Sequence, residues 1–464
     1  MRVSSDETSP VAGGHDSAQH VPIDGANIRI NCAGRNSTVR SPGNGRNGLI
    51  LMRWAKDKSI SPLRSAWRLS PPRTRRYLFT RGCAMVAPAI AREPPPARAG
   101  LAIAGELSAT TGLGEGARVM LRALAILGVR NWEFDVGPAW RPTAKPVLAG
   151  FRRSPSSVPL VVHANAPMMP ASLMRLPRSM VHGRRIIGYW AWELSRLPPE
   201  WAIGASFVHE VWVPSQFTAE AVEPLLPGRV RVVPHPVAVA PPSPSALDRS
   251  AFGLPDDAVV VLAVLNLASS LERKNPYAAI AAFRAAFGDR RDRLLVLKVG
   301  HPTHFPSEFA RLAEAADAPN IRLEARDLPT ADNHALFAAA DIVLSLHRGE
   351  AFGLVLAEAM LLGKPVIATG WSGNLEYMDQ DSAALVGYRL VAARDRRGTY
   401  DVAHAVWADP DLADAVAHLR RLADDEVERR ALGARAREAA CLRLGPHRLL
   451  AAIDALGLAP CRCE

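Results

Sequence analysis

Two glutamates in the C-terminal half of the chain, Glu350 and Glu358, bracket a short glycine-containing turn. Phe352, Gly353 and Leu354 lie between them, at the predicted start of a helix. The first backbone N–H groups of a helix have no partner inside it, and together with the positive end of the helix dipole they favour a phosphate. A carboxylate with two acceptor oxygens suits the vicinal hydroxyls of a ribose or a sugar. Together these residues predict a nucleotide-sugar site, although either glutamate taken alone is more often an ordinary turn or surface residue.

The pattern around these glutamates is that of a strand, a turn, a helix and a second strand. A β-branched run at residues 341–344 predicts a buried strand, and residues 354–362 have the apolar spacing of a helix that Gly363 ends. Residues 366–368 predict the second strand. Such a βαβ unit places the helix N-terminus beside the strand ends, where α/β sheets bind their ligands.

Two adjacent cations, Arg273 and Lys274, follow a predicted strand at residues 259–265 and precede a predicted helix at residues 277–287. Cations at a strand end suit a diphosphate, because each charge-assisted hydrogen bond contributes about 1.5–3 kcal/mol. The alternative is a loop whose charges only face solvent.

A glycine-rich loop, GLGEGA at residues 112–117, lies between a predicted strand at 101–104 and a helix to about residue 127. This is the dinucleotide-binding fingerprint, and Glu133 and Asp135 lie where a ribose-binding carboxylate is expected. Gly112 and Gly114 would let a diphosphate approach the backbone. The loop alone fits a nicotinamide-dependent oxidoreductase and a nucleotide-sugar enzyme equally well.

Polar and aromatic residues follow two further predicted strands, at residues 158–162 and 185–189. His163 comes directly after the first, and Trp190, Trp192 and Glu193 come after the second. Aromatic faces stack on the C–H face of a sugar while a carboxylate accepts its hydroxyls, so these residues predict a sugar or acceptor contact. The alternatives are a structural histidine and tryptophans that pack in the core.

The Glu350–Glu358 motif, with AFGLVLA inside it and AMLLGKPVIAT at residues 359–369, resembles the signature of retaining glycosyltransferases of family 4, the glycosyltransferase group 1 domain. The resemblance covers roughly residues 100–440. It implies the α/β GT-B fold, in which two Rossmann-like, doubly wound domains face each other across a cleft. It also implies an enzyme that needs no metal and no cofactor besides the nucleotide sugar itself.

The resemblance assigns roles to individual residues. It implies that Glu350, His163 and Lys274 act in catalysis, with Glu350 and His163 at the transferred sugar and Lys274 at the leaving diphosphate. Arg273 would assist Lys274, and Glu358 would bind the ribose. The uncharged residues 266–269 depart from the family, in which many members have a further arginine there.

Two aromatic segments resemble one branch of this family in particular. GYWAWE at residues 188–193 and VWVPS at 211–215 are similar to bacterial members that transfer mannose in polysaccharide assembly. They imply GDP-mannose as the donor and a glycan or lipid-linked acceptor.

The length of 464 residues predicts two domains with additional segments. Residues 1–99 are rich in Gly, Ser, Pro and Arg, and we expect a disordered, basic tail there. Residues 100–237 would form the N-terminal acceptor domain, and the proline-rich residues 238–250 the hinge. Residues 251–440 would form the donor domain, and 441–464 a C-terminal helix and tail.

The net charge of +11 is concentrated in the tail, where 16 Lys and Arg face 6 Asp and Glu. The remaining chain is near neutral, which argues against a nucleic-acid partner and leaves the tail a weak attraction to anionic lipid. Five scattered cysteines predict no disulfide framework, and no apolar run is long enough to span a bilayer. With no export signal, the sequence predicts a cytoplasmic protein, peripheral at the inner face of the membrane.

The sequence therefore predicts a hexosyltransferase. Two other classes stay open: an NAD-dependent Rossmann oxidoreductase, and a non-catalytic protein that binds a nucleotide sugar.

Overall fold

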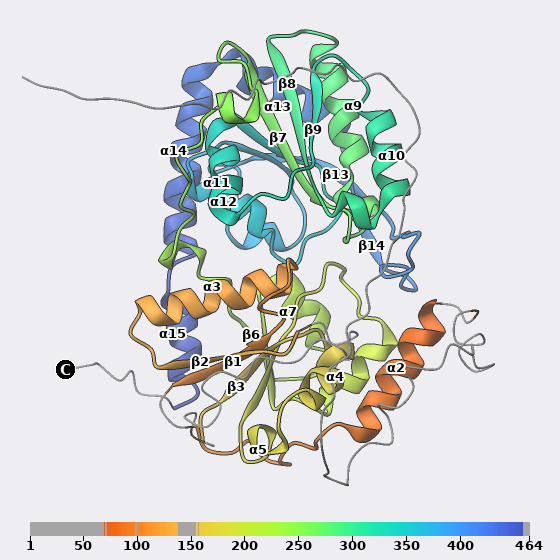
Figure 1. Cartoon of the computed structure of the whole chain (residues 1–464), viewed down its shortest axis with the longest axis vertical. Coiled ribbons are helices and arrows are strands. Elements are labelled where there is room, and N and C mark those ends of the chain that lie inside the picture. The colour runs from red at the N-terminus through yellow and green to blue at the C-terminus, as the bar shows by residue number, and fades with distance from the viewer. Residues whose placement is uncertain (1–68, 70–71, 98–99, 138–154, 156, 458–464) are drawn as a thin grey trace, which may run out of the picture. The chain divides into compact units, whose positions relative to one another are not determined.

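The computed structural model describes residues 69, 72–97, 100–137, 155 and 157–457, all of which belong to one compact unit, residues 65–464. It contains two six-stranded sheets of parallel strands, each flanked by helices (Figure 1). The prediction of two Rossmann-like domains is confirmed. Most of the predicted tail lies outside the described residues. Disorder is wrong for Pro72–Val86, which form helix α2.

The N-terminal sheet has the strand order β2-β1-β3-β4-β5-β6. Nearly every residue of its central strands is buried, as expected for a parallel sheet covered on both faces. The strands are β1 (Leu101–Gly105), β2 (Asn131–Asp135), β3 (Leu160–His163), β4 (Ile186–Tyr189), β5 (Glu210–Val213) and β6 (Val230–Val232). Its helices include α3 (Gly112–Ile126), α4 (Met169–Met174), α5 (Arg178–Val181), α6 (Ala202–Ala205) and α7 (Gln216–Val222).

The C-terminal sheet has the order β12-β11-β10-β7-β8-β9, the doubly wound order of a Rossmann fold. Its strands are β7 (Val259–Asn266), β8 (Arg293–Gly300), β9 (Ile321–Glu324), β10 (Ile342–Ser345), β11 (Val366–Thr369) and β12 (Ala384–Val386). Its helices are α8 (Leu271–Lys274), α9 (Pro276–Phe287), α10 (Pro306–Ala315), α11 (Thr330–Ala339) and α12 (Leu354–Leu361). Because β7 pairs with β10, the strand order reverses between them, and ligands bind outside such a switch point.

Three helices close the chain: α13 (Leu412–Asp424), α14 (Glu426–Arg443) and α15 (His447–Asp454). Leu449, Ala452 and Ile453 of α15 pack in one buried cluster with Leu101 and Ile103 of β1. Helix α15 therefore crosses back onto the first domain. Within the described residues, no helix is both long enough and apolar enough to cross a membrane.

An antiparallel hairpin, β13 (Tyr388–Ala392) and β14 (Val406–Pro410), follows the second sheet and was not predicted. Ala393, Tyr400, Ala405 and Trp407 from this segment pack in the core of the N-terminal domain. The hairpin segment therefore packs the second half of the chain against the N-terminal domain.

Gly433 of α14 packs closely on the loop after α12, and its replacement tests this contact. A Cβ at position 433 would lie 2.1 Å from the carbonyl oxygen of Gly363. Gly433→Ala is expected to lower the free energy of unfolding by about 1–3 kcal/mol, because backbone has to shift. Gly82 of α2 is the matched control: nothing lies within 4 Å, so Gly82→Ala should stabilise by up to about 1 kcal/mol. Equal effects in urea unfolding would contradict this packing.

Candidate functional site

The switch point brings the predicted cations and Glu350 together. Lys274 and Arg273 are in α8, which begins where the Ser270 side chain accepts a hydrogen bond from the Arg273 N–H. Glu350 lies in the turn after β10. Lys274 Nζ lies 2.5 Å from Glu350 Oε1, and Arg273 Nη1 lies 3.0 Å from Oε2. The two cations therefore hold both oxygens of one carboxylate.

Arg273 is buried and connects the two domains. Its Nη1 donates to the carbonyl oxygen of Gly349 at 2.7 Å, and its Nη2 donates to Ser269 Oγ at 2.8 Å. Nη2 also lies 3.6 Å from Oε1 of Glu193, which follows β4 in the N-terminal domain. The Lys274 side chain is 20% exposed and that of Arg273 only 5%. Lys274 is therefore the cation that can turn toward a ligand, whereas Arg273 organises the carboxylates.

The two glutamates of this cluster differ in electrostatic environment. Burial by itself would raise the pKa of Glu350, but Lys274 and Arg273 lower it well below its usual value. Burial raises the pKa of Glu193, only partly opposed by Arg273 and further raised by Glu350. The site thus contains a firmly ionised carboxylate beside one that protonates more easily.

The turn that carries Glu350 is held on both sides. Ser372, after β11, accepts a 2.8 Å hydrogen bond from the Glu350 N–H. Ser215, before α7, donates a 2.6 Å bond to the carbonyl oxygen of Ala351. At Gly349, a Cβ would lie 2.5 Å from the carbonyl oxygen of Glu193, so only glycine permits this approach. Sequence reasoning missed these residues, although the WSGN stretch of residues 371–374 follows a strand and could have drawn attention to Ser372.

The N-terminus of α12 has the predicted geometry. Gly353 has a φ of 90°, and among the described residues no side chain caps the helix start. Tyr377 Oη donates to the carbonyl oxygens of Phe352 and Gly353 at 3.1 and 2.6 Å, which fixes the turn. The Phe352 ring is buried against His235, so only backbone N–H groups of this turn, as at Leu354, can bind a ligand.

Glu358, on α12, lies 3.9 Å from Nε2 of His334 on α11. Burial would lower the pKa of His334, but the nearby Glu358 carboxylate raises it above the ordinary value. His334 Nδ1 also accepts a hydrogen bond from the Ser243 N–H in the linker, at 3.1 Å. Glu358 is thus partly exposed and paired with a histidine that sequence reasoning did not identify.

The predicted glycine-rich loop is instead the start of α3, and its two glycines Gly112 and Gly114 differ in their surroundings. Gly112 is exposed and a Cβ there would meet nothing within 4 Å, whereas a Cβ at Gly114 would lie 2.5 Å from the Glu106 carbonyl oxygen. Asp135 accepts hydrogen bonds from the N–H groups of Leu107, Ser108 and Gly137 at 3.1, 3.1 and 2.8 Å. Its carboxylate holds the loop between β1 and α3 and is not free for a ribose, which removes one support of the oxidoreductase alternative.

Gly112→Ala and Gly114→Ala are expected to separate binding from folding. Gly112→Ala should leave thermal stability unchanged and raise the KM for the donor, because a methyl group would limit the approach of the diphosphate. Gly114→Ala should lower stability by about 1–3 kcal/mol, because its Cβ meets backbone oxygens. Steady-state kinetics and urea unfolding measure the two effects. An unchanged donor KM in Gly112→Ala would remove Gly112 from the site.

His163 does not lie where the resemblance predicts a sugar contact. It is the last residue of β3, is 1% exposed, and stacks on the Tyr189 ring at a centroid distance of 4.4 Å. Burial, and then the nearby His235, lower its pKa well below the usual value. Neither ring nitrogen has a hydrogen-bond partner in the described chain. The predicted contact with the transferred sugar is wrong for this conformation, because the ring is enclosed in the core.

The prediction that Trp190 and Trp192 bind a sugar is also wrong. They are 0% and 4% exposed, and both pack against Trp201, at centroid distances of 5.6 and 5.1 Å. Burying rings of this size stabilises the core more than exposing them, so neither presents a free face. Glu193, the next residue, does reach the site.

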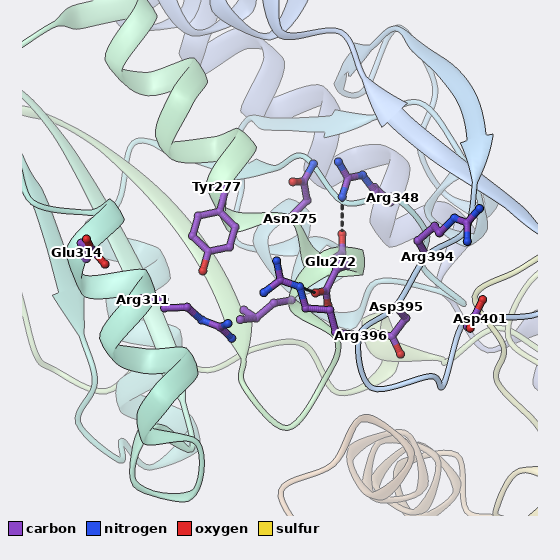
Figure 2. A pocket seen from close by; sticks show the side chains of 11 residues that line it. Glu272, Asn275, Tyr277, Arg311, Glu314, Arg348, Arg394, Asp395, Arg396 and Asp401 are labelled. Atoms are coloured by element: carbon purple, nitrogen blue, oxygen red, sulfur yellow. Dashed lines mark hydrogen bonds and ion pairs between the residues drawn. The ribbon is translucent and has the colours of Figure 1, made fainter. Parts of the chain in front are cut away.

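A hollow of about 660 Å³ lies next to α8 (Figure 2). Glu272 and Asn275 line it, whereas Arg273 and Lys274, between them in the chain, do not. Four arginines and four carboxylates line the hollow, so its formal charges balance. Arg396 lies 3.4 Å from Glu272, and Arg348 donates to the Glu272 carbonyl oxygen at 3.1 Å. We place the site at Glu350, where charge is concentrated at the switch point.

No group of three or more His, Cys, Asp or Glu side chains in the described chain is arranged to hold a metal ion.

Solved structures share the GT-B fold with this chain. HepE of Anabaena, in complex with UDP and glucose, superposes with a TM-score of 0.53 at 13% identity, over 77% of this chain and 99% of that one. Sucrose-phosphate synthase of Thermosynechococcus elongatus gives 0.52 at 16% identity, over 77% and 98%.

Sequence comparison finds relatives of part of the chain. Residues 258–409 match the family of glycosyl transferases group 1, and this segment includes Arg273, Lys274, Glu350 and Glu358. A D-inositol 3-phosphate glycosyltransferase of Kineococcus radiotolerans is 30% identical over 217 residues, 45% of this chain and 47% of that protein. One from a Nocardioides species is 31% identical over 246 residues, 49% and 48%. The chain thus spans about half the length of the curated relatives it matches.

Proposed function

We propose that this protein is a retaining glycosyltransferase that moves a hexose from a nucleoside diphosphate sugar to a hydroxyl acceptor. The observation that carries the proposal is the buried cluster of Lys274, Arg273 and Glu350, which faces Glu193 of the other domain. This cluster lies beside the open N-terminus of α12 and inside the segment that matches glycosyl transferases group 1.

The donor would occupy the space that these groups define. Its diphosphate would bind the backbone N–H groups at Gly353 and Leu354 together with Lys274, and Gly112 would permit its approach. Glu358 would accept the ribose hydroxyls. Lys274 would turn from Glu350 to the diphosphate, while Arg273 keeps Glu350 in place to accept hydroxyls of the sugar.

In the reaction, the bond between the anomeric carbon and the diphosphate oxygen breaks, and negative charge grows on the departing oxygen. Lys274 and the helix N-terminus would lie where this charge develops, the arrangement that usually contributes most to catalysis. The acceptor hydroxyl attacks from the side that the diphosphate leaves, and its proton passes to the departing diphosphate. Configuration is retained and no enzyme nucleophile is needed.

The donor we favour is GDP-mannose, on the resemblance of residues 188–193 and 211–215 to mannose-transferring proteins. A UDP-sugar is the second candidate, because HepE was solved with UDP and glucose. We propose a glycan or lipid-linked acceptor at the inner face of the membrane. An inositol phosphate is the alternative, because the curated relatives carry that acceptor in their names.

A panel of nucleotide sugars tests the proposal. GDP-mannose, UDP-glucose and UDP-N-acetylglucosamine are each incubated with the protein, and free nucleoside diphosphate is measured with and without acceptor. Release from one donor, absent in Glu350→Gln, would support the transferase. A thermal shift without release, even with lipid-linked and inositol phosphate acceptors, would favour a non-catalytic binding protein. A fluorescence change with NADH would support the oxidoreductase.

A further inference from the structure

The segment that joins β13 to β14 reaches from the hairpin into the catalytic cluster. Asp395, which is 7% exposed, fastens it there. Asp395 Oδ1 accepts a 2.8 Å hydrogen bond from Ser270 Oγ, the residue that caps α8. Oδ2 accepts from the N–H groups of Thr399 and Tyr400 at 2.7 and 3.3 Å. The helix that carries Arg273 and the backbone of Tyr400 are therefore held by one carboxylate.

The Tyr400 side chain contacts residues of both domains. Its ring lies over the Arg273 guanidinium, 5.5 Å from Cζ to the ring centroid. The opposite domain supplies Trp192, whose ring stacks on it at 5.3 Å with an interplanar angle of 26°. Its hydroxyl also acts on the Glu193 carboxylate, whose pKa it lowers. Tyr400 is 8% exposed, so these contacts take up its surface.

These contacts restrict the motion of Arg273. The ring covers the guanidinium, and the backbone oxygen of Gly349 and the hydroxyl of Ser269 hold its two ends. A cation over a ring contributes about 0.5–2 kcal/mol, more where water is excluded. Without the ring, Arg273 could rotate away from Glu350, and Glu350 would lose its fixed orientation. Without the hydroxyl, Glu193 would lose a partner of its ionised form.

We propose that Tyr400 is a positioning residue that keeps Arg273 between Glu350 and Glu193 during sugar transfer. The inference rests on the proposed function, since it assigns Tyr400 to the same reaction. The segment between β13 and β14 thus supplies a buried tyrosine that neither six-stranded sheet contributes.

Tyr400→Phe isolates the hydroxyl, because it keeps the ring over Arg273. Burial raises the pKa of Glu193, and the groups that face it are Arg273 and Lys274, which lower it, Glu350, which raises it, and the Tyr400 hydroxyl, which lowers it. Removing the hydroxyl therefore raises this pKa. If Glu193 acts ionised, activity in Tyr400→Phe should fall on the acid side at a pH about one unit higher than in the wild type.

The full experiment measures donor hydrolysis against pH for the wild type, Tyr400→Phe, Tyr400→Leu and Tyr388→Phe. Tyr400→Leu removes the ring as well as the hydroxyl. Its kcat should be at least 10-fold lower than that of Tyr400→Phe, with a smaller change in the donor KM. Tyr388 lies on the same hairpin and is 40% exposed, so Tyr388→Phe is the matched control and should behave as the wild type. Thermal melting verifies folding, and Tyr400→Phe carries the test if Tyr400→Leu does not fold.

The outcomes distinguish this inference from the proposed function. A shifted acid limb in Tyr400→Phe, with an unshifted control, supports it. A uniformly lower kcat with the wild-type pH profile shows a merely structural tyrosine and overturns it. A wild type that releases no nucleoside diphosphate from any donor overturns the proposed function, and the inference with it.

Discussion

Glu350→Gln is expected to lower kcat by at least about 100-fold, with a smaller change in donor KM. The amide keeps the shape of the side chain but removes the charge that Lys274 and Arg273 surround. Lys274 then has no anion to hold it near the diphosphate position before the donor binds, and the sugar hydroxyls lose a strong acceptor. Steady-state kinetics of donor hydrolysis measure the effect.

The same substitution should also destabilise the protein. The buried Arg273 and the partly exposed Lys274 lose their common partner, which in buried ion pairs costs about 3–5 kcal/mol, reduced here because Glu193 still contacts Arg273. Since the folded-state pKa of Glu350 is below its usual value, its stabilising contribution is present above about pH 4.3 and is lost as the pH falls through the folded-state pKa. The difference from the wild type in urea unfolding should therefore be constant near neutral pH and narrow in acid.

Asp341→Asn is the matched control for Glu350→Gln. Asp341 forms a partly buried ion pair with Arg249 at 2.6 Å, away from the cluster. Its replacement should cost stability and leave kcat near the wild-type value. Turnover of Glu350→Gln within about threefold of the wild type would end the assignment of this site.

Arg273→Met is expected to produce the largest loss of stability among single substitutions in the site. Both Glu350 and Glu193 would lose their shared cation in a buried environment, at a cost of about 3–5 kcal/mol. Arg273→Lys should recover only part of this, because an ammonium cannot bridge Ser269, the Gly349 carbonyl oxygen and two carboxylates as the guanidinium fork does. Urea unfolding of the three proteins provides the comparison.

Lys274→Met provides the contrasting result. The Lys274 side chain is partly exposed, so its loss should cost only about 1 kcal/mol of stability but lower kcat about 100-fold or more. Arg389→Met is the control for both, because Arg389 is 80% exposed where it pairs with Asp409. If Arg273→Met unfolds like this control, Arg273 does not connect the two domains.

Much of the fold and part of the site could be predicted from the sequence. Strands such as β10 and β7 are continuous apolar runs, and turn residues such as Gly353 mark where the next element begins. The local sequence pattern is therefore enough to locate these elements. The residues after parallel strands collect at one edge of a sheet, which explains why Arg273, Lys274 and Glu350 could be assigned to one site.

Tertiary structure decided which of the predicted residues face that site. Trp190, Trp192 and His163 follow or end strands as Glu193 does, yet their side chains lie in the core while Glu193 meets Arg273. No local pattern distinguishes these directions, because each depends on how the chain turns after its strand and on what packs there.

The contacts of Asp135 and Tyr400 could likewise not be predicted from the local sequence pattern. The position of Asp135 suits a ribose, but the loop that folds over it takes both carboxylate oxygens. Tyr400 lies between β13 and β14 in a segment without a recognisable motif, and only the packing of this hairpin on the other domain places its ring on Arg273 and Trp192. The sequence by itself determined the two sheets and the charged strand-end residues, because these depend on neighbours along the chain. Which groups meet in the cluster depends on contacts between residues 80 to 125 positions apart, and only the tertiary structure decided it.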